Sequence, residues 1–132
     1  MSKVFDFLKS TGTFYYATVE DNKPILRPFG FLMEYEGKLY IGMGKQKNCF
    51  KQTIANPNIA ICACNAQRQW IRISGKAIPD DRPETTAYAF EYAPHMKNIY
   101  NEKTGFVMGL FYIEDGEAEI VDGLATQGVI KF

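Results

Sequence analysis

A single arginine stands among apolar and aromatic residues in the segment PILRPFGFLMEY, Pro24–Tyr35. Residue types alternate there with a period of two, which is typical of a strand and places Arg27 on the same face as Phe29. A guanidinium stays protonated, so on a buried face it requires an anion or several hydrogen-bond acceptors. Pro28 lacks a ladder donor and Gly30 lacks a side chain, which indicates a sheet edge, a bulge or the close approach of another group.

Three lysines surround the start of a helix that we expect to begin near Lys45 or Gln46. Lys47 and Lys51 are four residues apart and therefore share a helix face. Positive charge in the first turn is unfavourable for the helix dipole, and no Ser, Thr or Asp is in place to cap the free amides, although Asn48 lies near. These features together describe an anion site, most simply for a phosphate. The alternative is an ordinary surface helix with solvated lysines.

No familiar catalytic motif is present. The sequence has no G-x-S-x-G, no paired carboxylates in an apolar context, no P-loop and no dinucleotide fingerprint, which argues against hydrolytic chemistry. His95 has no partner in the sequence, and Cys49, Cys62 and Cys64 lack zinc-site spacing, so we predict no metal site and interpret the cysteines as small buried residues. Cations combined with ten Phe, eight Tyr and one Trp suit a phosphorylated aromatic ligand, which can itself supply the chemistry.

The composition predicts one globular domain over residues 1–132. Fifteen acidic and fifteen basic side chains balance, which argues against a nucleic-acid-binding chain. No apolar run of 18 residues occurs, and the charged amino terminus does not suit a signal peptide, so we expect a cytoplasmic protein without membrane contact.

The pattern of elements predicts a mainly β protein with peripheral helices. Strand signals with hairpin turns give six or seven mostly antiparallel strands, interrupted midway by the lysine-flanked helix. The last hairpin is expected to join Phe106–Glu114 to Glu117–Val121 through a turn at Asp115 and Gly116. Mostly antiparallel strands with few helices favour a closed or partly closed barrel.

Five segments carry a family resemblance: GTFYYATV at 12–19, PILRPFGF at 24–31, GKLYIGM at 37–43, KNCFKQ at 47–52 followed by Asn56 and Pro57, and WIRISGKA at 70–77. In their order and spacing, over most of residues 1–78, they resemble the small FMN-binding split-barrel proteins related to pyridoxamine 5′-phosphate oxidase. The resemblance implies a six-stranded antiparallel split barrel. It also implies a homodimer with two FMN sites at the subunit interface.

By this resemblance, the cofactor-binding residues are Arg27, Pro28, Phe29, Gly30, Lys45, Lys47, Asn48, Lys51, Trp70 and Arg72. The first four would line the path of the isoalloxazine and ribityl groups. The next four would hold the phosphate. The last two would approach the flavin, from the same or from the other subunit.

The chain also departs from the oxidase itself. True pyridoxamine-phosphate oxidases are longer and end in an arginine- and histidine-bearing segment, whereas this chain ends in GLATQGVIKF. The resemblance therefore implies the short, nitroimidazole-reductase-like branch and an FMN-linked redox role on an unidentified small substrate, with catalytic residues unknown. The alternatives are a flavin-binding carrier or sensor, a nucleic-acid-binding barrel and a haem-binding relative. Neutral net charge and the absence of histidine from the first 94 residues argue against the last two.

Overall fold

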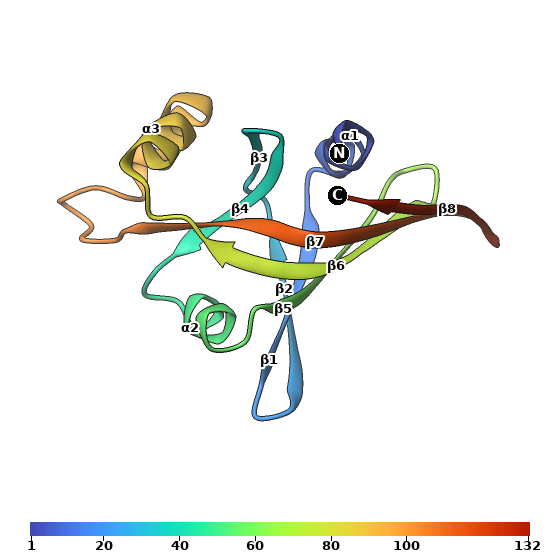
Figure 1. The fold of residues 1–132 in the computed structure, drawn as a ribbon. Helices are drawn as coiled ribbons and strands as arrows, with labels where there is room; N and C mark the ends of the chain where they lie inside the picture. The colour runs from blue at the N-terminus through green and yellow to red at the C-terminus, as the bar shows by residue number, and fades with distance from the viewer.

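The computed structural model describes the whole chain, residues 1–132. Eight strands form one antiparallel sheet in the order β2-β1-β5-β6-β7-β4-β3, with β8 paired to β7 (Figure 1). The strands are β1 (Phe14–Glu20), β2 (Lys23–Phe29), β3 (Leu32–Tyr35), β4 (Lys38–Gly44), β5 (Asn58–Cys64), β6 (Gln69–Pro79), β7 (Met108–Asp122) and β8 (Ala125–Lys131). The helices are α1 (Ser2–Thr11), α2 (Asn48–Ala55) and α3 (Pro83–Tyr92), and a 3-10 helix follows at Pro94–Asn98.

The sheet curls into a split barrel. β2 and β3 stand at opposite ends of the strand order, yet only Gly30 and Phe31 separate them along the chain. Three Cα–Cα steps span about 11 Å at most, so the two ends of the sheet must lie close together. β2 and β3 do not pair with each other, so the barrel stays open along this line. The predicted mainly β split-barrel fold with peripheral helices is confirmed, with eight strands in place of six.

The segment predicted as one long strand, Pro24–Tyr35, is in fact two strands on different walls of the barrel. Alternation holds in β2, where Leu26 and Pro28 are exposed, but it fails at the crossing, where Phe31 and the two residues after it are all buried. Gly42 of β4 makes room for Phe31, because a Cβ at Gly42 would lie 2.9 Å from the Phe31 ring.

The predicted hairpin at Asp115 and Gly116 is wrong, because β7 runs unbroken through both residues. Asp115 has a φ of 53°, and the register with β6 shifts between Ser74 and Lys76, so the strand bends at a bulge rather than turning back. Gly116 and Phe132 exchange two backbone hydrogen bonds of 2.8 Å, which continue the pairing with the chain end. The turn lies later, between β7 and β8.

The helices cover only part of the sheet surface. Val4 and Leu8 of α1 and Cys49 of α2 belong to the large core cluster inside the curled sheet. Ala89 of α3 packs with Tyr40 of β4 on the opposite face, at the β4–β3 end. The outer face of β2, β1, β5 and β6 remains exposed. No helix is long and apolar enough to span a membrane.

Candidate functional site

Arg27 is half-buried on β2, with its guanidinium against α2. Its Nη1 donates to the backbone oxygen of Tyr16 at 3.2 Å and to Oγ1 of Thr18 at 2.9 Å, and its Nη2 donates to Oε1 of Gln52 at 2.8 Å. These acceptors are neutral, and Arg27 forms no ion pair. Its charge is therefore uncompensated by direct contact. Its Nε–H and one Nη2–H remain free to bind an anion.

Gln52 fixes the position of this guanidinium relative to α2. Its Oε1 accepts from Arg27 and, at 2.7 Å, from Thr18, while its Nε2 donates to the Glu20 carboxylate at 2.7 Å. Sequence reasoning missed Gln52 and Thr18. The available signal was that Gln52 stands beside the apolar face of its helix, where a buried amide needs partners.

The start of α2 has free backbone donors. The helix begins at Asn48, two or three residues later than predicted, and no side chain caps it. The amides of Asn48 and Cys49 make no hydrogen bond within the protein. Lys47 occupies the N-cap position, and both it and Lys51 are exposed. Free amides, the positive end of the dipole and two lysines are the ingredients of an anion site.

A cleft of about 500 Å³ lies between α2 and the turn that joins β1 to β2. Its lining residues are Val19, Glu20, Asp21, Asn22, Asn48, Lys51, Gln52, Ala55 and Asn56. Arg27 contacts this lining through Gln52. The charges divide the cleft, because Lys51 lies on α2 while Glu20 and Asp21 lie on the opposite side. An anion is therefore favoured on the helix side.

Lys45 lies apart from this group. Its ammonium pairs with Asp81 at 3.0 Å and lies 5.9 Å from the centre of the Phe50 ring. It lines a different cleft, beside α3. The structure thus brings together Arg27, Asn48 and Lys51, with Lys47 at the helix start, but not Lys45.

Arg72 and Pro28 belong to the outer face of the sheet. Arg72 pairs with Cys62, Cys62 with Tyr15, and Tyr15 with Pro28, and cross-strand partners share a face. Arg27 directly precedes Pro28 on β2, so its side chain points to the inner face.

Trp70 lies on the same outer face as Arg72, two residues before it on β6. The Arg72 guanidinium lies 5.2 Å from the centre of the Trp70 ring and 3.7 Å from the Glu119 carboxylate. Within one chain, Trp70 and Arg72 therefore do not reach the cleft beside α2.

Phe29 and Gly30 lie elsewhere again. The Phe29 ring stacks on Tyr16, with centroids 4.9 Å apart, and meets Phe14 edge-on at 6.0 Å, so it belongs to the core packing. Gly30 lies in the link between β2 and β3 and lines a third cleft together with His95. The resemblance grouped these residues by sequence position, and the barrel separates them.

The cysteines differ in burial. Cys49 is buried, as predicted, but Cys62 and Cys64 are exposed, so the prediction is wrong for these two. Only the inner face of β5, with Ile61, is covered, and Cys62 and Cys64 lie on its outer face. No group of three or more His, Cys, Asp or Glu side chains could hold a metal ion.

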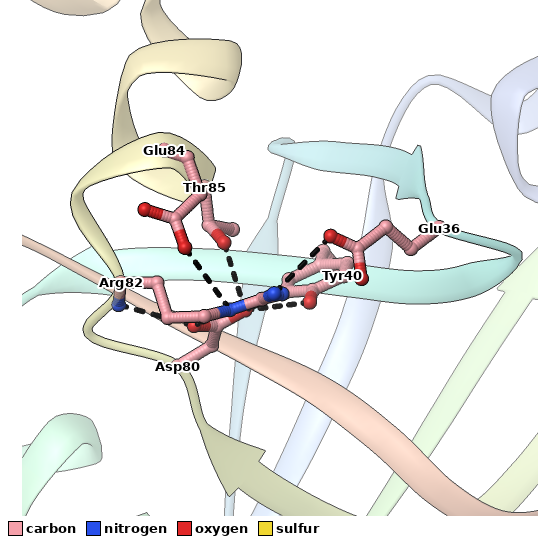
Figure 2. A network of polar contacts seen from close by, with 6 residues as sticks. All are labelled: Glu36, Tyr40, Asp80, Arg82, Glu84 and Thr85. Carbon is pink, nitrogen blue, oxygen red and sulfur yellow. Dashed lines mark hydrogen bonds and ion pairs between the residues drawn. The ribbon is translucent and has the colours of Figure 1, made fainter.

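A polar network that the sequence did not reveal joins β4, the end of β6 and α3 (Figure 2). The Asp80 carboxylate is buried and accepts from Tyr40 at 2.7 Å and from Thr85 at 3.0 Å. Arg82 donates hydrogen bonds to the same carboxylate from Nε and Nη2, each at 3.0 Å. Its Nη1 donates to the Glu36 carboxylate at 3.2 Å. Asp80 thus fixes the entry to α3, because it also accepts from the backbone amide of Arg82 at 3.1 Å.

The network shifts the pKa values of its members. Hydrogen bonds from Arg82 lower the pKa of Asp80 well below its usual range, with further help from Tyr40 and Thr85. Burial and the hydrogen bond to Asp80 raise the pKa of Tyr40 above its ordinary value. Every group is satisfied, and no buried side-chain N or O atom in the protein lacks a partner. We interpret the network as structural.

The fold and sequence are similar to those of known proteins. A NimC/NimA family protein from Clostridium acetobutylicum is 40% identical, with a TM-score of 0.92, over 100% of this chain and 92% of that chain. A general stress protein 26-related protein of the pyridoxinephosphate oxidase family, from the same organism, is 9% identical, with a TM-score of 0.74, over 99% and 93%. A FAD-binding protein from Mesorhizobium loti is 13% identical, with a TM-score of 0.62, over 91% and 94%. No protein-family model and no curated protein matches the chain.

Proposed function

The chain belongs to the NimC/NimA family, and from that premise we propose that it is an FMN-dependent oxidoreductase acting on a small substrate, with two flavin sites in a homodimer. The fold is shared with a protein of the pyridoxinephosphate oxidase family and with a FAD-binding protein. Both names point to phosphorylated, largely aromatic ligands.

One observation carries the proposal: the guanidinium of Arg27 is held beside α2 without a carboxylate partner. Free amides at Asn48 and Cys49 and the ammonium groups of Lys47 and Lys51 lie on the same helix. These donors fit a phosphate, which prefers charge-assisted hydrogen bonds and helix N-termini. The adjoining cleft, about 500 Å³, is of the size typical of cofactor sites.

The proposed homodimer would account for the large apolar side chains that are exposed on the outer sheet face. Tyr15 and Leu26 are 47% and 67% exposed there, and Val129 of β8 is 59% exposed. Cross-strand pairing places Cys62 and Arg72 on the same face. Exposed apolar side chains that share one face of a sheet are typical of an interface.

A second copy on this face would bring Trp70 and Arg72 of one chain toward the other chain. This arrangement accounts for the separation, within one chain, of residues that the resemblance assigns to one site. In the site itself, Arg27 and the start of α2 bind and orient the phosphate. Bound FMN supplies hydride transfer, which the side chains of this chain do not provide.

The dimer is tested by Leu26→Asp, with Asp6→Asn on α1 as a control. We expect sedimentation equilibrium to show a dimer for the native chain and the control and a monomer for Leu26→Asp, because a buried carboxylate without a partner disfavours the interface. A native chain that is monomeric at micromolar concentration would contradict the dimer.

The redox role is tested by mixing FMN-loaded protein with NADH or NADPH and then with a quinone or nitroaromatic acceptor. Bleaching of the flavin absorbance near 450 nm, followed by its return on addition of acceptor, would support an oxidoreductase. A stable yellow protein that neither nicotinamide reduces would instead support a flavin carrier or sensor.

A further inference from the structure

A second cleft, of about 450 Å³, opens between the end of β4, α3 and the segment before β7. Its lining residues are Lys45, Asp81, Thr86, Phe90, Tyr100, Asn101, Glu102, Gly105, Phe106, Val107 and Met108, none of which lines the cleft beside α2. We propose that this cleft binds an organic cation, namely a protonated or quaternary amine attached to an aromatic or alkyl body. The proposal does not rest on flavin binding.

Three aromatic side chains, those of Phe90, Tyr100 and Phe106, line the cleft. Phe90 and Tyr100 are half-buried, and Phe106 and Val107 are 45% and 56% exposed. A ligand with an apolar body would remove this apolar surface from water, which is favourable. Aromatic rings also attract cations, and a set of rings around one cavity is a known way to bind ammonium groups.

The charges of the lining residues favour a positively charged ligand. Lys45 is the only cation, and it is already paired with Asp81 at 3.0 Å. Glu102 has no ion-pair partner, so the lining carries one uncompensated negative charge. An organic anion would be repelled by Glu102, whereas an ammonium group would compensate it.

Hydrogen bonds within the segment hold one wall of the cleft in place. The Asn101 side chain donates to the Lys97 carbonyl at 2.8 Å and accepts from the Thr104 amide at 2.9 Å. The Thr104 hydroxyl donates to the Ile99 carbonyl at 2.6 Å, and the Gly105 amide donates to the Asn101 carbonyl at 2.9 Å. The wall is therefore formed before a ligand binds, which limits the entropy lost on binding.

Isothermal titration of the full chain with benzyltrimethylammonium tests the proposal, with benzoate as an aromatic anion of similar size. We expect the cation to bind with a Kd of about 1 mM or tighter, and benzoate to bind at least about tenfold more weakly. Shifts of amide resonances within residues 81–108 would place the cation in this cleft. Absence of binding, or benzoate binding as tightly as the cation, would overturn the proposal.

Two substitutions test which residues of the cleft determine the affinity for the cation. Glu102→Gln should weaken cation binding about two- to fivefold, and Phe106→Ala about three- to tenfold. Glu91→Gln makes the same charge change on an exposed part of α3 outside the cleft and should leave the affinity unchanged. Native affinity in both cleft variants would refute the cleft as the binding site. So would an altered oligomeric state of Phe106→Ala with unaltered affinity, because the exposed rings would then belong to a subunit interface.

Discussion

The guanidinium of Arg27 donates to the side-chain oxygen of Gln52 at 2.8 Å, and this contact joins β2 to α2. Gln52 also accepts from Thr18 and donates to Glu20, so both its oxygen and its nitrogen are held by hydrogen bonds. The charge of Arg27 is thus held in place without being neutralised by a direct ion pair. A cation positioned in this way can bind an anion with little further loss of side-chain entropy.

Arg27→Ala should weaken FMN binding by about 1.5–3 kcal/mol, because charge-assisted hydrogen bonds to the phosphate are lost. This loss corresponds to a rise in Kd of roughly 10- to 150-fold. Arg27→Lys should recover only part of this, since an ammonium cannot satisfy several neutral acceptors and a phosphate at once. Flavin fluorescence titration measures both affinities. Arg68→Ala, at an exposed turn, is the control and should bind FMN normally. Native affinity in Arg27→Ala would show that this arginine has only a structural role.

The three lysines near the start of α2 should differ in how much they contribute to FMN binding. Lys47→Ala and Lys51→Ala should each weaken FMN binding several-fold, and the losses should shrink at high salt because exposed charges are screened. Lys45→Ala should have little effect, because its ammonium pairs with Asp81 in the other cleft. Titrations at about 0.05 M and 0.5 M NaCl compare the three variants with Lys3→Ala on α1. If Lys45→Ala proves the most damaging, the phosphate lies nearer to α3 than proposed.

Asp80→Asn should lower the free energy of unfolding at pH 7 by about 1–3 kcal/mol, because its buried partners lose a charged acceptor. The pKa of Asp80 is lowered in the folded state, so the unfolded chain binds its proton more readily. This contribution is present above the unfolded pKa of about 3.9 and is lost as the pH falls toward the folded pKa.

Urea unfolding at pH 7, 4 and 3 measures this dependence. The gap in stability between the native chain and Asp80→Asn should narrow as the pH falls, whereas Asp6→Asn, at an exposed site of α1, should follow the native chain. A gap that stays constant down to pH 3 would mean that Asp80 titrates alike in both states.

Gly109→Ala should destabilise the protein by about 1–3 kcal/mol through overpacking. A Cβ there would lie 2.5 Å from the Phe50 ring of α2 and 3.2 Å from Cγ of Lys45. Because Phe50 must move, α2 should shift and FMN binding should weaken as well. Gly30→Ala is the matched control, since no atom lies within 4 Å of its Cβ position. Thermal unfolding of both variants provides the comparison, with flavin titration of Gly109→Ala beside the native chain. Equal losses of stability in the two variants would argue against crowding at Gly109.

The sequence predicted the fold class because alternation and turn residues are local signals. The turn at Asp21 and Asn22, both with positive φ, and the similar turn at Glu36 and Gly37 are examples. The prediction from sequence failed where pairing with strands far away in the chain determines the local structure. Asp115 and Gly116 look like a hairpin turn, but their neighbours on β6 and at Phe132 keep β7 continuous.

The candidate site was predicted only in part, because the sequence reveals local patterns and not contacts between distant residues. Lysines at the start of a helix are a local pattern, and α2 does present Asn48 and Lys51 to the cleft. The partner of Arg27 was not predictable, because Gln52 is 25 residues away and meets it only when the sheet curls over α2. Lys45 was also assigned to the phosphate, at the mouth of the helix, but the end of β4 directs its ammonium to Asp81.

The most direct measurement compares FMN with riboflavin, titrated into protein freed of small molecules and followed by flavin fluorescence and visible absorbance. If Arg27 and the start of α2 hold the phosphate, FMN should saturate one site per chain and bind at least about tenfold more tightly than riboflavin, which lacks the phosphate. Inorganic phosphate should compete with it. Equal affinity for the two flavins, or no binding of either, would contradict a flavin phosphate site between β2 and α2.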